Sequence, residues 1–404
     1  MNSHDCSWQG WLRPDGRKGI RNELLVIYTV ECAGHVAHRI GESEDNVHVL
    51  GFSGCFDSPY VIRILSCFAR HPNVGGVLCV GLGCEYTQPE KIAEVAVRSG
   101  RPAEWFYIQD SGGTLPSIEK GKELVRALKK RMSQDAKSVS MGWCDLVVAA
   151  ECGGSDFTSG IAGNRVVGAF LDRLVDAGGT GVAGEIVELV GLKNALLARA
   201  ANEKAAVEIE SAYDKMIEYN KRVQQYSISP GNFAGGLTTI EEKSAGAYAK
   251  YGTRPLQGVR KVSQALPCAG MWMLDALEDE HFMYYGYTNP SDTQDVLEHI
   301  SVGAHLILFV TGRGSVTGSP ISPTLKITGN DATYRKLEAD MDFNAGGILT
   351  GRCSLAEATE CLSDLVEATA AGTPTKSESL GHREYIINYK YQDAAAKAKA
   401  CGSC

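Results

Sequence analysis

The stretch LLVIYTVEC, residues 24–32, contains the pattern that decides the fold: an uninterrupted apolar run that ends in a cysteine. The segments VHVLGFSGC (47–55), VGGVLCVGLGC (74–84) and DLVVAAEC (145–152) repeat it. Strands buried on both faces of a parallel sheet have such continuous apolar runs, whereas half-exposed strands alternate. Longer amphipathic stretches separate the runs, so the sequence predicts repeated β-α units and an α/β fold.

We expect two Rossmann-like lobes with parallel sheets, followed by a C-terminal α/β region. A chain of 404 residues is too long for one ordinary hydrophobic core. We place the first lobe at 1–137, the second at 138–253, the C-terminal region at 254–390 and a flexible tail at 391–404. Because ligands bind beyond the carboxyl ends of parallel strands, we expect the active site at those strand ends.

Several local patterns refine this picture. Ser133–Ser140 is polar and predicts a linker between the lobes. Lys193–Gln224 is charged throughout and predicts one long helix. The best strand of the C-terminal region is His305–Val310, which is again followed by a glycine-rich loop.

Composition and charge exclude several classes of function. The chain is 44% hydrophobic and 22% charged, as in ordinary soluble enzymes, and it contains no apolar stretch long enough to cross a bilayer. Its net charge of −8 argues against nucleic-acid binding. The opening stretch MNSHDCSWQGWLRPDG lacks the apolar run of a signal peptide, so we expect a cytoplasmic protein without membrane or nucleic-acid partners.

Cysteine is the residue type that says most about chemistry. The chain has 13 cysteines, and the cytosol expected for it keeps thiols reduced. Four predicted strands end at a cysteine, namely Cys32, Cys55, Cys84 and Cys152. Thiolates at one topological position would face one cleft, where they suit iron, an iron–sulfur cluster or zinc. An inert buried thiol is the alternative interpretation for each of them.

Two loops rich in arginine and glycine predict recognition of an anion. RPDGRKGIRN, before the first strand, contains Arg17 and Arg21, although a solvated surface explains this loop equally well. The second loop follows His305–Val310 and reads Thr311, Gly312, Arg313, Gly314 and Ser315. Because the arginine fork matches a carboxylate and glycine exposes backbone N–H groups, we expect Arg313 to bind substrate.

Two further segments offer polar side chains with little bulk. ECGGSDFTSG supplies Ser155, Asp156 and Ser159, for which helix capping is the alternative role. GGLTTIEEKSAG supplies Glu242 and Lys243, for which a solvated helix face is the alternative. The chain has neither a Walker phosphate loop nor a GxSxG elbow, which argues against nucleotide and serine hydrolysis.

The order of these motifs resembles that of the altronate and galactarate dehydratase family. The motifs extend from about Gly10 to Tyr385 and read GWLRPDGRKGIRN, TVEC, SGC, HPNV, GLGCE, ECGGSD, GNFAGGLTTIEEKS, TGRGS, DMDFNAG and GTPTKSESLGHREY. The resemblance implies β-elimination of water from an aldonic or aldaric acid to a 2-keto-3-deoxy acid, with ferrous iron as cofactor. The same family includes the large subunit of sulfolactate sulfo-lyase, which removes sulfite from a 2-hydroxy acid.

The mechanism implied by this resemblance gives the candidate residues their roles. Iron, as Fe²⁺ or an iron–sulfur cluster, would be held by the four cysteines. Arg313 would hold the far end of the hydroxy-acid substrate, Glu242 or Lys243 would move the proton, and Asp156 is a further catalytic candidate. The substrate-binding candidates are Arg17, Arg21, Ser155, Ser159, Thr311, Gly312, Gly314, Ser315 and Asn344.

The chain departs from the family pattern in two places. Sugar-acid dehydratases usually read SGITANPA after GGSD, whereas this chain reads SGIAGNRVVG, which adds Arg165. The segment Glu278–Asp295 is rich in tyrosine where a short loop is expected, and it suggests a reshaped pocket. The substrate is therefore open: a sugar-acid dehydratase is the first hypothesis, and a carbon–sulfur lyase acting on sulfolactate is the second.

The resemblance also bears on partners. Family members often carry a small amino-terminal domain of the SAF type, which this sequence lacks, so we expect a separately encoded small subunit of that type. A homo-oligomer is also expected. The third hypothesis is a non-catalytic subunit that requires the small partner.

Overall fold

The computed structural model describes residues 7–224, 226–277 and 291–388. The chain divides into two compact units. The N-terminal unit is built on Gln9–Ser140, and the large unit on Met141–Leu277 and residues 291–384. Each is described by itself. In both, strands alternate with helices and the main sheet is parallel, so the predicted α/β class is confirmed.

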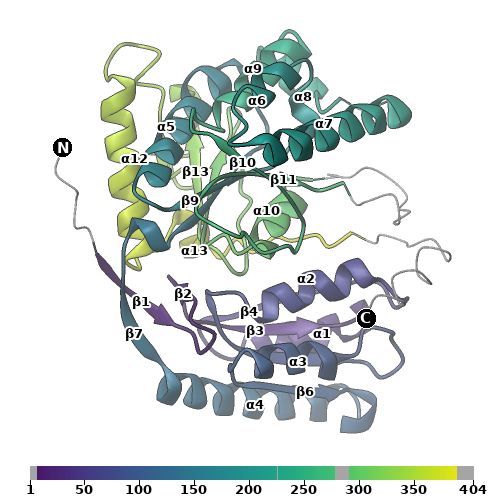
Figure 1. Cartoon of the computed structure of the whole chain (residues 1–404). Coiled ribbons are helices and arrows are strands. Elements are labelled where there is room, and N and C mark those ends of the chain that lie inside the picture. Colours follow the sequence, from purple (N-terminus) through teal and green to yellow (C-terminus); the bar gives the residue numbers. More distant parts are fainter. Residues whose placement is uncertain (1–6, 225, 278–290, 389–404) are drawn as a thin grey trace. The chain divides into compact units, whose positions relative to one another are not determined.

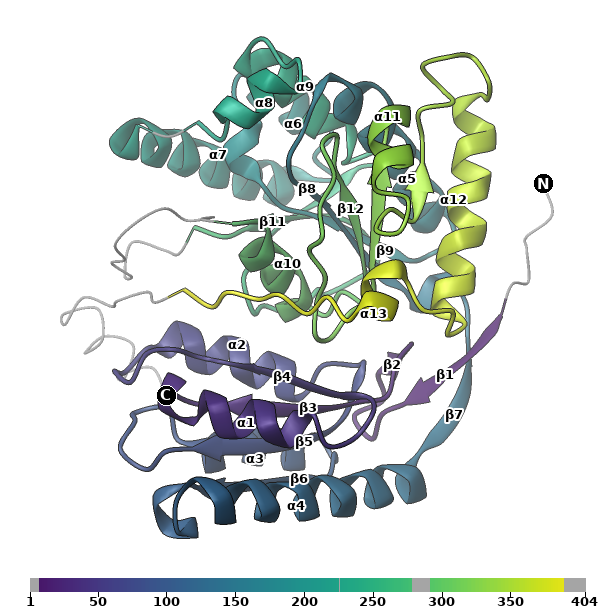
Figure 2. The ribbon, with the colours of Figure 1, turned by 180° about the vertical axis from the view of Figure 1, so that it is seen from behind.

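The N-terminal unit contains a four-stranded parallel sheet with the strand order β4-β3-β5-β6. Its strands are β3 (Glu23–Tyr28), β4 (Val47–Gly51), β5 (Val74–Gly81) and β6 (Ala103–Tyr107). Its helices are η1 (Glu31–Ala33), α1 (Gly34–Gly41), α2 (Pro59–Ala69), α3 (Pro89–Arg98), η2 (Gln109–Ser111) and α4 (Thr114–Asp135). Helix α1 packs on α4 and α2 packs on α3, and Figures 1 and 2 show the two pairs on opposite faces of the sheet.

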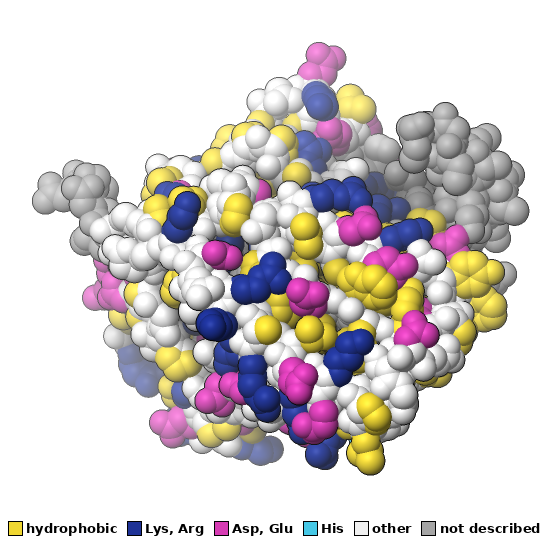
Figure 3. Space-filling view, turned by 90° about the horizontal axis from the view of Figure 1, so that it is seen from below, with side chains coloured by type: hydrophobic (Ala, Val, Ile, Leu, Met, Phe, Trp, Pro, Cys, Tyr) yellow, Lys and Arg dark blue, Asp and Glu magenta, His cyan; other side chains and the backbone are white. Residues whose placement is uncertain are grey.

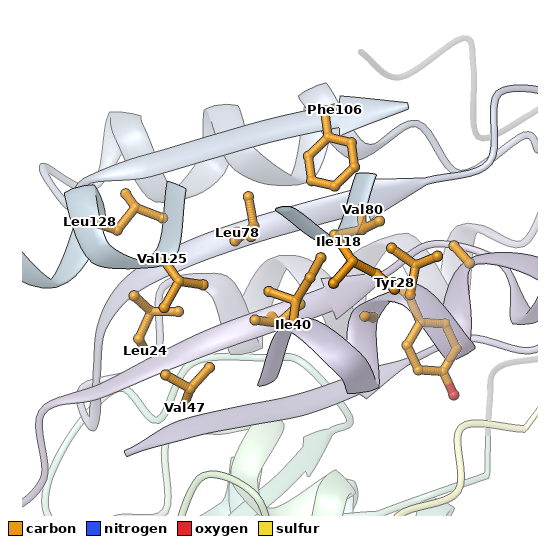
Figure 4. Packing of buried hydrophobic residues seen from close by; sticks show 14 of the residues in the cluster. Leu24, Tyr28, Ile40, Val47, Leu78, Val80, Phe106, Ile118, Val125 and Leu128 are labelled. Atoms are coloured by element: carbon orange, nitrogen blue, oxygen red, sulfur yellow. The ribbon is translucent and has the colours of Figure 1, made fainter. Parts of the chain in front are cut away.

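The core between the sheet and the α1–α4 pair explains why these apolar runs become strands. Leu24 and Tyr28 of β3 point to the same face, where they lie with Ile40 of α1 and Val125 of α4 (Figure 4), and Val26, between them on the strand, belongs to the same buried cluster. Burying a side chain of this size contributes roughly 1.5–3 kcal/mol relative to exposure. On the face seen in Figure 3, basic and acidic side chains are interspersed with hydrophobic ones.

A small second sheet corrects the linker prediction. Strand β1 (Trp8–Leu12) pairs antiparallel with β2 (Lys18–Gly19), and β7 (Lys137–Met141) completes a three-stranded sheet in the order β2-β1-β7. The predicted linker Ser133–Ser140 is therefore wrong: α4 continues to Asp135, and a strand begins two residues later. The polar side chains of Ser133–Ser140 are mostly exposed, because the end of α4 and strand β7 both lie at the surface.

The large unit is built on one seven-stranded parallel sheet with the order β10-β11-β9-β8-β12-β13-β14. The strands are β8 (Val147–Cys152), β9 (Thr180–Ala183), β10 (Leu256–Lys261), β11 (Gly270–Asp275), β12 (Leu306–Val310), β13 (Thr324–Thr328) and β14 (Phe343–Asn344). The residues expected to form a second lobe and a C-terminal region thus contribute strands to one sheet. The strand order reverses direction at β8, and such a switch point is where open α/β sheets bind ligands.

The helices of the large unit flank this sheet. They are η3 (Trp143–Asp145), η4 (Ser159–Gly163), α5 (Asn164–Asp176), η5 (Ile186–Glu188), α6 (Lys193–Leu197), α7 (Glu203–Val223), α8 (Pro230–Ala234), α9 (Ile240–Ala249), α10 (Asp292–Ser301), α11 (Asp331–Lys336), α12 (Leu355–Ala370) and α13 (Lys376–Leu380). Helix α5 packs against α12 and α9, and α10 packs against β8 (Figures 1 and 2). In the described part of the chain, no helix is long and apolar enough to cross a membrane.

The long helix predicted over Lys193–Gln224 is interrupted. It divides into α6 and α7, because the side chain of Asn202 accepts a hydrogen bond from the Ala205 backbone N–H at 3.0 Å and caps a new helix. The residues between the helices also pair with β10, through a parallel bridge of Ala200 with Leu256. The charge pattern alone does not show this break: the Asn202 cap is a local signal, whereas the bridge to Leu256 depends on a strand distant in sequence.

Candidate functional site

A pocket of about 290 Å³ opens in the large unit at the carboxyl end of β8. Among the side chains that line it are those of Cys152, Ser155, Ser159, Glu188, Glu242 and Lys243. Five of these six are candidates from the sequence, and Glu188 is the addition. The volume of the pocket suits a small polar molecule.

Two glycines set the distance between the walls of the pocket. The π-helical turn η4 crosses α9 at Gly160 and Gly246, where a Cβ on Gly160 would lie only 2.6 Å from the Gly246 Cα. A side chain at either position would force the two segments apart. Single π-helical turns are frequent at functional sites. This close crossing brings α9, with Lys243 on it, over the end of β8.

The first charged pair of the pocket is Lys243 with Glu188. Lys243 Nζ lies 2.7 Å from Glu188 Oε1, and both side chains are buried. Burial opposes both charges, but the nearby lysines outweigh it and lower the Glu188 pKa. In turn, the neighbouring negative charges, Glu188 first, raise the Lys243 pKa. An ammonium and a carboxylate therefore stay charged at the pocket wall at neutral pH.

Cys152 lies beside a second buried pair, Lys250 with Glu185. Lys250 Nζ donates to Cys152 Sγ at 3.3 Å and to Glu185 Oε2. The sulfur is 3.4 Å from both Glu185 Oε2 and Glu188 Oε2. Burial, reinforced by the two carboxylates, raises the pKa of the Cys152 thiol well above its usual value. Glu185 has a φ of 62°, a conformation uncommon for a residue with a side chain, which tends to occur at functional sites.

The structure offers two groups of metal donors among the residues that it describes. In each group one ligand atom per residue lies within 4.8 Å of the others: Cys152, Glu185 and Glu188 form the first, and Glu151, Glu185 and Asp295 the second. The first combines sulfur with carboxylate oxygen, a donor set that suits ferrous iron, and two of its members reach the pocket.

The other predicted iron ligands lie in the N-terminal unit. Cys32, Cys55 and Cys84 follow β3, β4 and β5, and all three are exposed, as expected for residues just beyond strand ends. The Tyr86 N–H donates to the Cys55 carbonyl at 3.1 Å, so these strand-end loops contact each other. Cys152 belongs to the other unit and the other sheet. A centre with four thiolates stays a prediction.

Asp156 lines the pocket, but its carboxylate organises the loop around it. Oδ1 accepts hydrogen bonds from the Thr158 N–H at 2.8 Å and the Thr158 hydroxyl at 2.6 Å, and from the Ser159 N–H at 3.1 Å. Oδ2 accepts from the Asn330 side chain at 2.9 Å. This geometry supports the capping role that was the alternative to catalysis.

The loop from Thr311 to Ser315 packs behind Asp156. A Cβ on Gly312 would lie 2.1 Å from the Asp156 Cγ, and Thr311 Oγ1 accepts from the Gly314 N–H at 3.0 Å. Ser315 Oγ likewise accepts from a backbone N–H of its own loop. Arg313 is exposed and donates to the Gly231 carbonyl at 2.7 Å. None of the five lines the pocket, so the loop supports the pocket wall from behind.

The three remaining candidates are not among the residues that line the pocket. Asn344, in β14, donates from Nδ2 to Asp331 at 2.9 Å. Arg17 and Arg21 belong to the N-terminal unit, where Arg17 pairs with Asp15 at 2.7 Å and Arg21 donates to the carbonyl of the preceding residue. These contacts match the structural alternative given for the first arginine-rich loop.

The sequence reasoning missed Glu185, Glu188 and Lys250. The segment GEIVE, residues 184–188, places two carboxylates three residues apart just after β9, which is a strand-end signal like that of the cysteines. Lys250 follows Lys243 by seven residues, a spacing that returns to the same face of a helix. Both signals are present in the sequence, but neither shows that Lys243 pairs with Glu188 and Lys250 with Glu185.

Comparison with known proteins places the chain in a family. The family model described as "D-galactarate/Altronate dehydratase, C-terminal" matches residues 143–393, and the one described as "D-galactarate dehydratase/Altronate hydrolase, second domain" matches residues 10–133.

Three curated relatives illustrate its range. The chain is 30% identical to (2R)-sulfolactate sulfo-lyase subunit beta of Chromohalobacter salexigens, over 95% of this chain and 98% of the relative. It is 31% identical to altronate dehydratase of Bacillus subtilis, over 85% of this chain and 70% of the relative. It is 30% identical to altronate dehydratase of Escherichia coli, over 95% of this chain and 78% of the relative. The chain belongs to the D-galactarate/altronate dehydratase family of lyases.

Proposed function

We propose that this protein is a hydro-lyase that removes water from an aldonic or aldaric acid and yields a 2-keto-3-deoxy acid. The observation that carries this proposal is the pair Lys243–Glu188, buried and charged in the wall of a small pocket at the switch point of the sheet. A fixed ammonium in a pocket sheltered from water stabilises the negative charge that develops on a carboxylate during removal of its α-proton.

The pocket provides a distinct position for each part of such a substrate. The substrate carboxylate binds the Lys243 ammonium, and its hydroxyls bind the Ser155 and Ser159 hydroxyls. At the exposed edge, Arg165 matches a second anionic group at the far end of the molecule. Arg165 takes over the role that was expected of Arg313, because Arg165 lines the pocket and Arg313 does not.

The proton is transferred by Glu242. Its Oε2 accepts both hydrogen bonds from Thr238, each 2.8 Å long, so we assign the other oxygen, Oε1, as the base. Oε1 takes the proton from C2, the C–H electron pair forms the C2–C3 double bond, and the C3–O bond breaks. The departing hydroxide takes the same proton and leaves as water, and the enol tautomerises to the 2-keto acid. Lys243 stays protonated throughout, as its raised pKa requires.

Ferrous iron belongs to this proposal as a cofactor. Cys152, Glu185 and Glu188 would hold it, and the softness of one sulfur among oxygen donors fits iron better than magnesium. When bound, iron would polarise the substrate as a Lewis acid. This assignment replaces three of the four predicted cysteine ligands with carboxylates that lie next to Cys152.

A carbon–sulfur lyase acting on sulfolactate is the second candidate. It is favoured by the match to nearly the whole length of the sulfolactate sulfo-lyase beta subunit, whereas the two altronate dehydratases extend further beyond the match. Arg165 suits a sulfonate as well as a second carboxylate. In this case a small subunit of the SAF type, encoded separately, would be the partner of this chain.

Turnover of a panel of acids distinguishes the candidates. The protein is reconstituted anaerobically with ferrous iron and incubated with aldonic acids, aldaric acids and sulfolactate. A 2-keto-3-deoxy acid formed from a sugar acid supports the dehydratase. Sulfite released from sulfolactate, without turnover of sugar acids, supports the lyase instead. If iron is bound but no acid is turned over until a small subunit is added, the third hypothesis holds.

A further inference from the structure

Three exposed cysteines of the N-terminal unit take no part in the proposed pocket chemistry. Cys32, Cys55 and Cys84 follow β3, β4 and β5, which lie side by side in the order β4-β3-β5 (Figure 2). Exposed free thiols are open to oxidation, which makes three of them at one end of a sheet a liability unless they bind something.

The register of the sheet places these three cysteines at one level. Tyr28 of β3 pairs with Gly51 of β4 on one side and with Val80 of β5 on the other. Each cysteine follows the member of this row on its own strand by four residues. Because the strands are parallel, the three cysteines leave the sheet at the same edge and at the same level.

A hydrogen bond between two of the loops draws them together beyond the end of β3. Strands β4 and β5 are separated by β3, so their backbones lie about 10 Å apart in the sheet. Beyond the sheet, the Tyr86 N–H nevertheless donates to the Cys55 carbonyl at 3.1 Å. The loops that carry Cys55 and Cys84 therefore meet across the end of the strand that leads to Cys32.

A buried carboxylate holds the loop of Cys84 in place. Glu85 Oε2 accepts hydrogen bonds from the backbone N–H groups of Gly83 at 2.8 Å and Cys84 at 3.0 Å. Glu85 Oε1 accepts from the Thr29 hydroxyl at 2.7 Å, which ties this loop to the end of β3. Burial alone would raise the Glu85 pKa, but these bonds outweigh burial and lower it. An ionised side chain thus fixes the position of Cys84 relative to β3.

We propose that Cys32, Cys55 and Cys84 hold an iron–sulfur cluster of the four-iron type, separate from the iron at the pocket. Cysteine thiolates are the ligands that hold such clusters. Three loops from adjacent parallel strands, level with one another and joined by hydrogen bonds, supply one thiolate each. The fourth iron of the cluster is then left without a ligand among these cysteines, with a position for a small oxygen ligand.

The spacing of the sulfur atoms favours a cluster over a single metal ion. One tetrahedral metal with bonds of about 2.3 Å would require its sulfurs to lie about 3.8 Å apart. Among the described residues, the donor groups whose atoms lie within 4.8 Å of one another do not include these three cysteines. In a cluster, each thiolate binds a different iron, so the ligands stand further apart and the loops do not have to collapse onto one atom.

Aromatic side chains lie next to two of the cysteines. Phe56 directly follows Cys55, and Tyr86 lies two residues after Cys84. They are 63% and 64% exposed. Apolar groups around a metal centre control the access of solvent to it, so these side chains suit the surroundings of a cluster at a protein surface.

Acid-labile sulfide tests the proposal, because a mononuclear iron site contains none. The full chain is purified anaerobically and reconstituted with ferrous iron, sulfide and a thiol reductant, and iron and labile sulfide are measured per chain. We expect about four sulfides per chain and the broad visible absorption of a four-iron cluster. Cys32→Ser, Cys55→Ser and Cys84→Ser should each lose most of the sulfide. Cys144→Ser, at an exposed cysteine of the large unit, should keep it.

Further comparisons separate this site from the pocket and from misfolding. Cys152→Ser should lose at most the pocket iron and retain the sulfide. Because Cys32, Cys55 and Cys84 are exposed, their replacement should leave the circular dichroism and melting temperature of the cluster-free chain unchanged. The proposal is overturned if the folded, unaltered chain binds no labile sulfide, if any of the three serine variants retains it, or if zinc occupies these cysteines instead. No readout involves turnover, so the result is separate from that for the proposed hydro-lyase.

Discussion

Each unit of this protein contains a cluster of buried or half-buried charges, and the two clusters differ in how completely they are paired. In the N-terminal unit, Arg13 donates to the Pro72 and Arg21 carbonyls and to Asn22, each at 2.6 Å. Arg101 donates to Asp15 at 2.9 Å and to the Val74 carbonyl at 2.9 Å. These bonds tie the β1–β2 hairpin to the main sheet.

In the large unit, carboxylates outnumber their cationic partners. Lys243 and Lys250 face Glu151, Glu185, Glu188 and Asp295, and the thiol of Cys152 lies among them. Burial raises the Glu151 pKa to about 8, and Glu185 keeps an uncommon backbone conformation. The charges of the N-terminal cluster are paired and stabilise the fold. The large unit has more carboxylates than cations beside its pocket, where a bound substrate or cation can supply the missing charge. Four predictions test this distinction.

Lys243→Met is expected to have the largest effect. Removing the ammonium deprives the developing enediolate of its stabilising charge, so kcat/KM for the substrate found in the panel should fall by about 10³-fold, or roughly 4 kcal/mol. Lys193→Met is the matched control, because Lys193 forms an exposed ion pair with Asp214. If Lys243→Met lowered stability but left kcat/KM unchanged, the distinction between the clusters would fail.

Arg101→Met should show the opposite profile. Its side chain is 1% exposed, and its loss removes the hydrogen bonds that it donates to Asp15 and to the Val74 and His71 carbonyls. We expect the free energy of unfolding to fall by about 3 kcal/mol in denaturant titrations, with kcat per folded molecule unchanged. Arg98→Met, at an exposed i,i+4 pair, should change stability by less than about 0.5 kcal/mol. If fully folded Arg101→Met had a lower kcat, the N-terminal cluster would have a functional role and the comparison would fail.

Gly160→Ala tests whether the close helix crossing positions the pocket charges. The added methyl group meets the Gly246 backbone, so η4 and α9 must separate. We expect a loss of about 2 kcal/mol in stability, together with a several-fold decrease in kcat, because Lys243 moves with α9. Gly231→Ala is the control, since a Cβ there meets only ordinary contacts. Equal stability of the two variants would contradict the crossing argument.

The smallest expected effect is the pH dependence of the Asp15 contribution. Burial alone would raise the Asp15 pKa, but Arg17 and Arg101 outweigh burial and hold the pKa at about 2, below its usual 3.8. The contribution is therefore present above about pH 4 and lost as the pH falls toward 2. After a discount for partial exposure, Asp15→Asn should cost about 1 kcal/mol at pH 7 and nearly nothing at pH 2. A difference that is independent of pH would show that the ion pair does not contribute.

Much of the fold was predictable because the strands are continuous apolar runs. The strands β3, β4 and β5 of the N-terminal unit were located within a few residues, and so were β8 and β12. The sequence could not reveal that β8 and β12 are neighbours, since more than a hundred residues separate them and hydrophobic periodicity carries no strand order. The strand after α4 was missed because it depends on pairing with β1, which is distant in sequence, and the break at Asn202 was missed because the charge pattern hid a local helix cap.

The candidate site was predictable in part. Cys152, Ser155, Ser159, Glu242 and Lys243 reach the pocket because they follow a strand end or occupy one helix face. The partners of Cys152 were missed because two glycines and the left-handed backbone of Glu185 bring them together. The tyrosine-rich stretch, from Glu278 to Pro290, lies outside the described residues, as does the predicted tail.

The most direct test of the central claim is the position of a bound sugar acid in an anaerobic crystal structure of the iron-loaded protein. We expect the substrate carboxylate within hydrogen-bond distance of Lys243 Nζ, with the remainder of the molecule filling the pocket beside Cys152. A sugar acid bound instead by Cys32, Cys55 and Cys84 of the N-terminal unit, with the pocket of the large unit empty, would contradict the assignment.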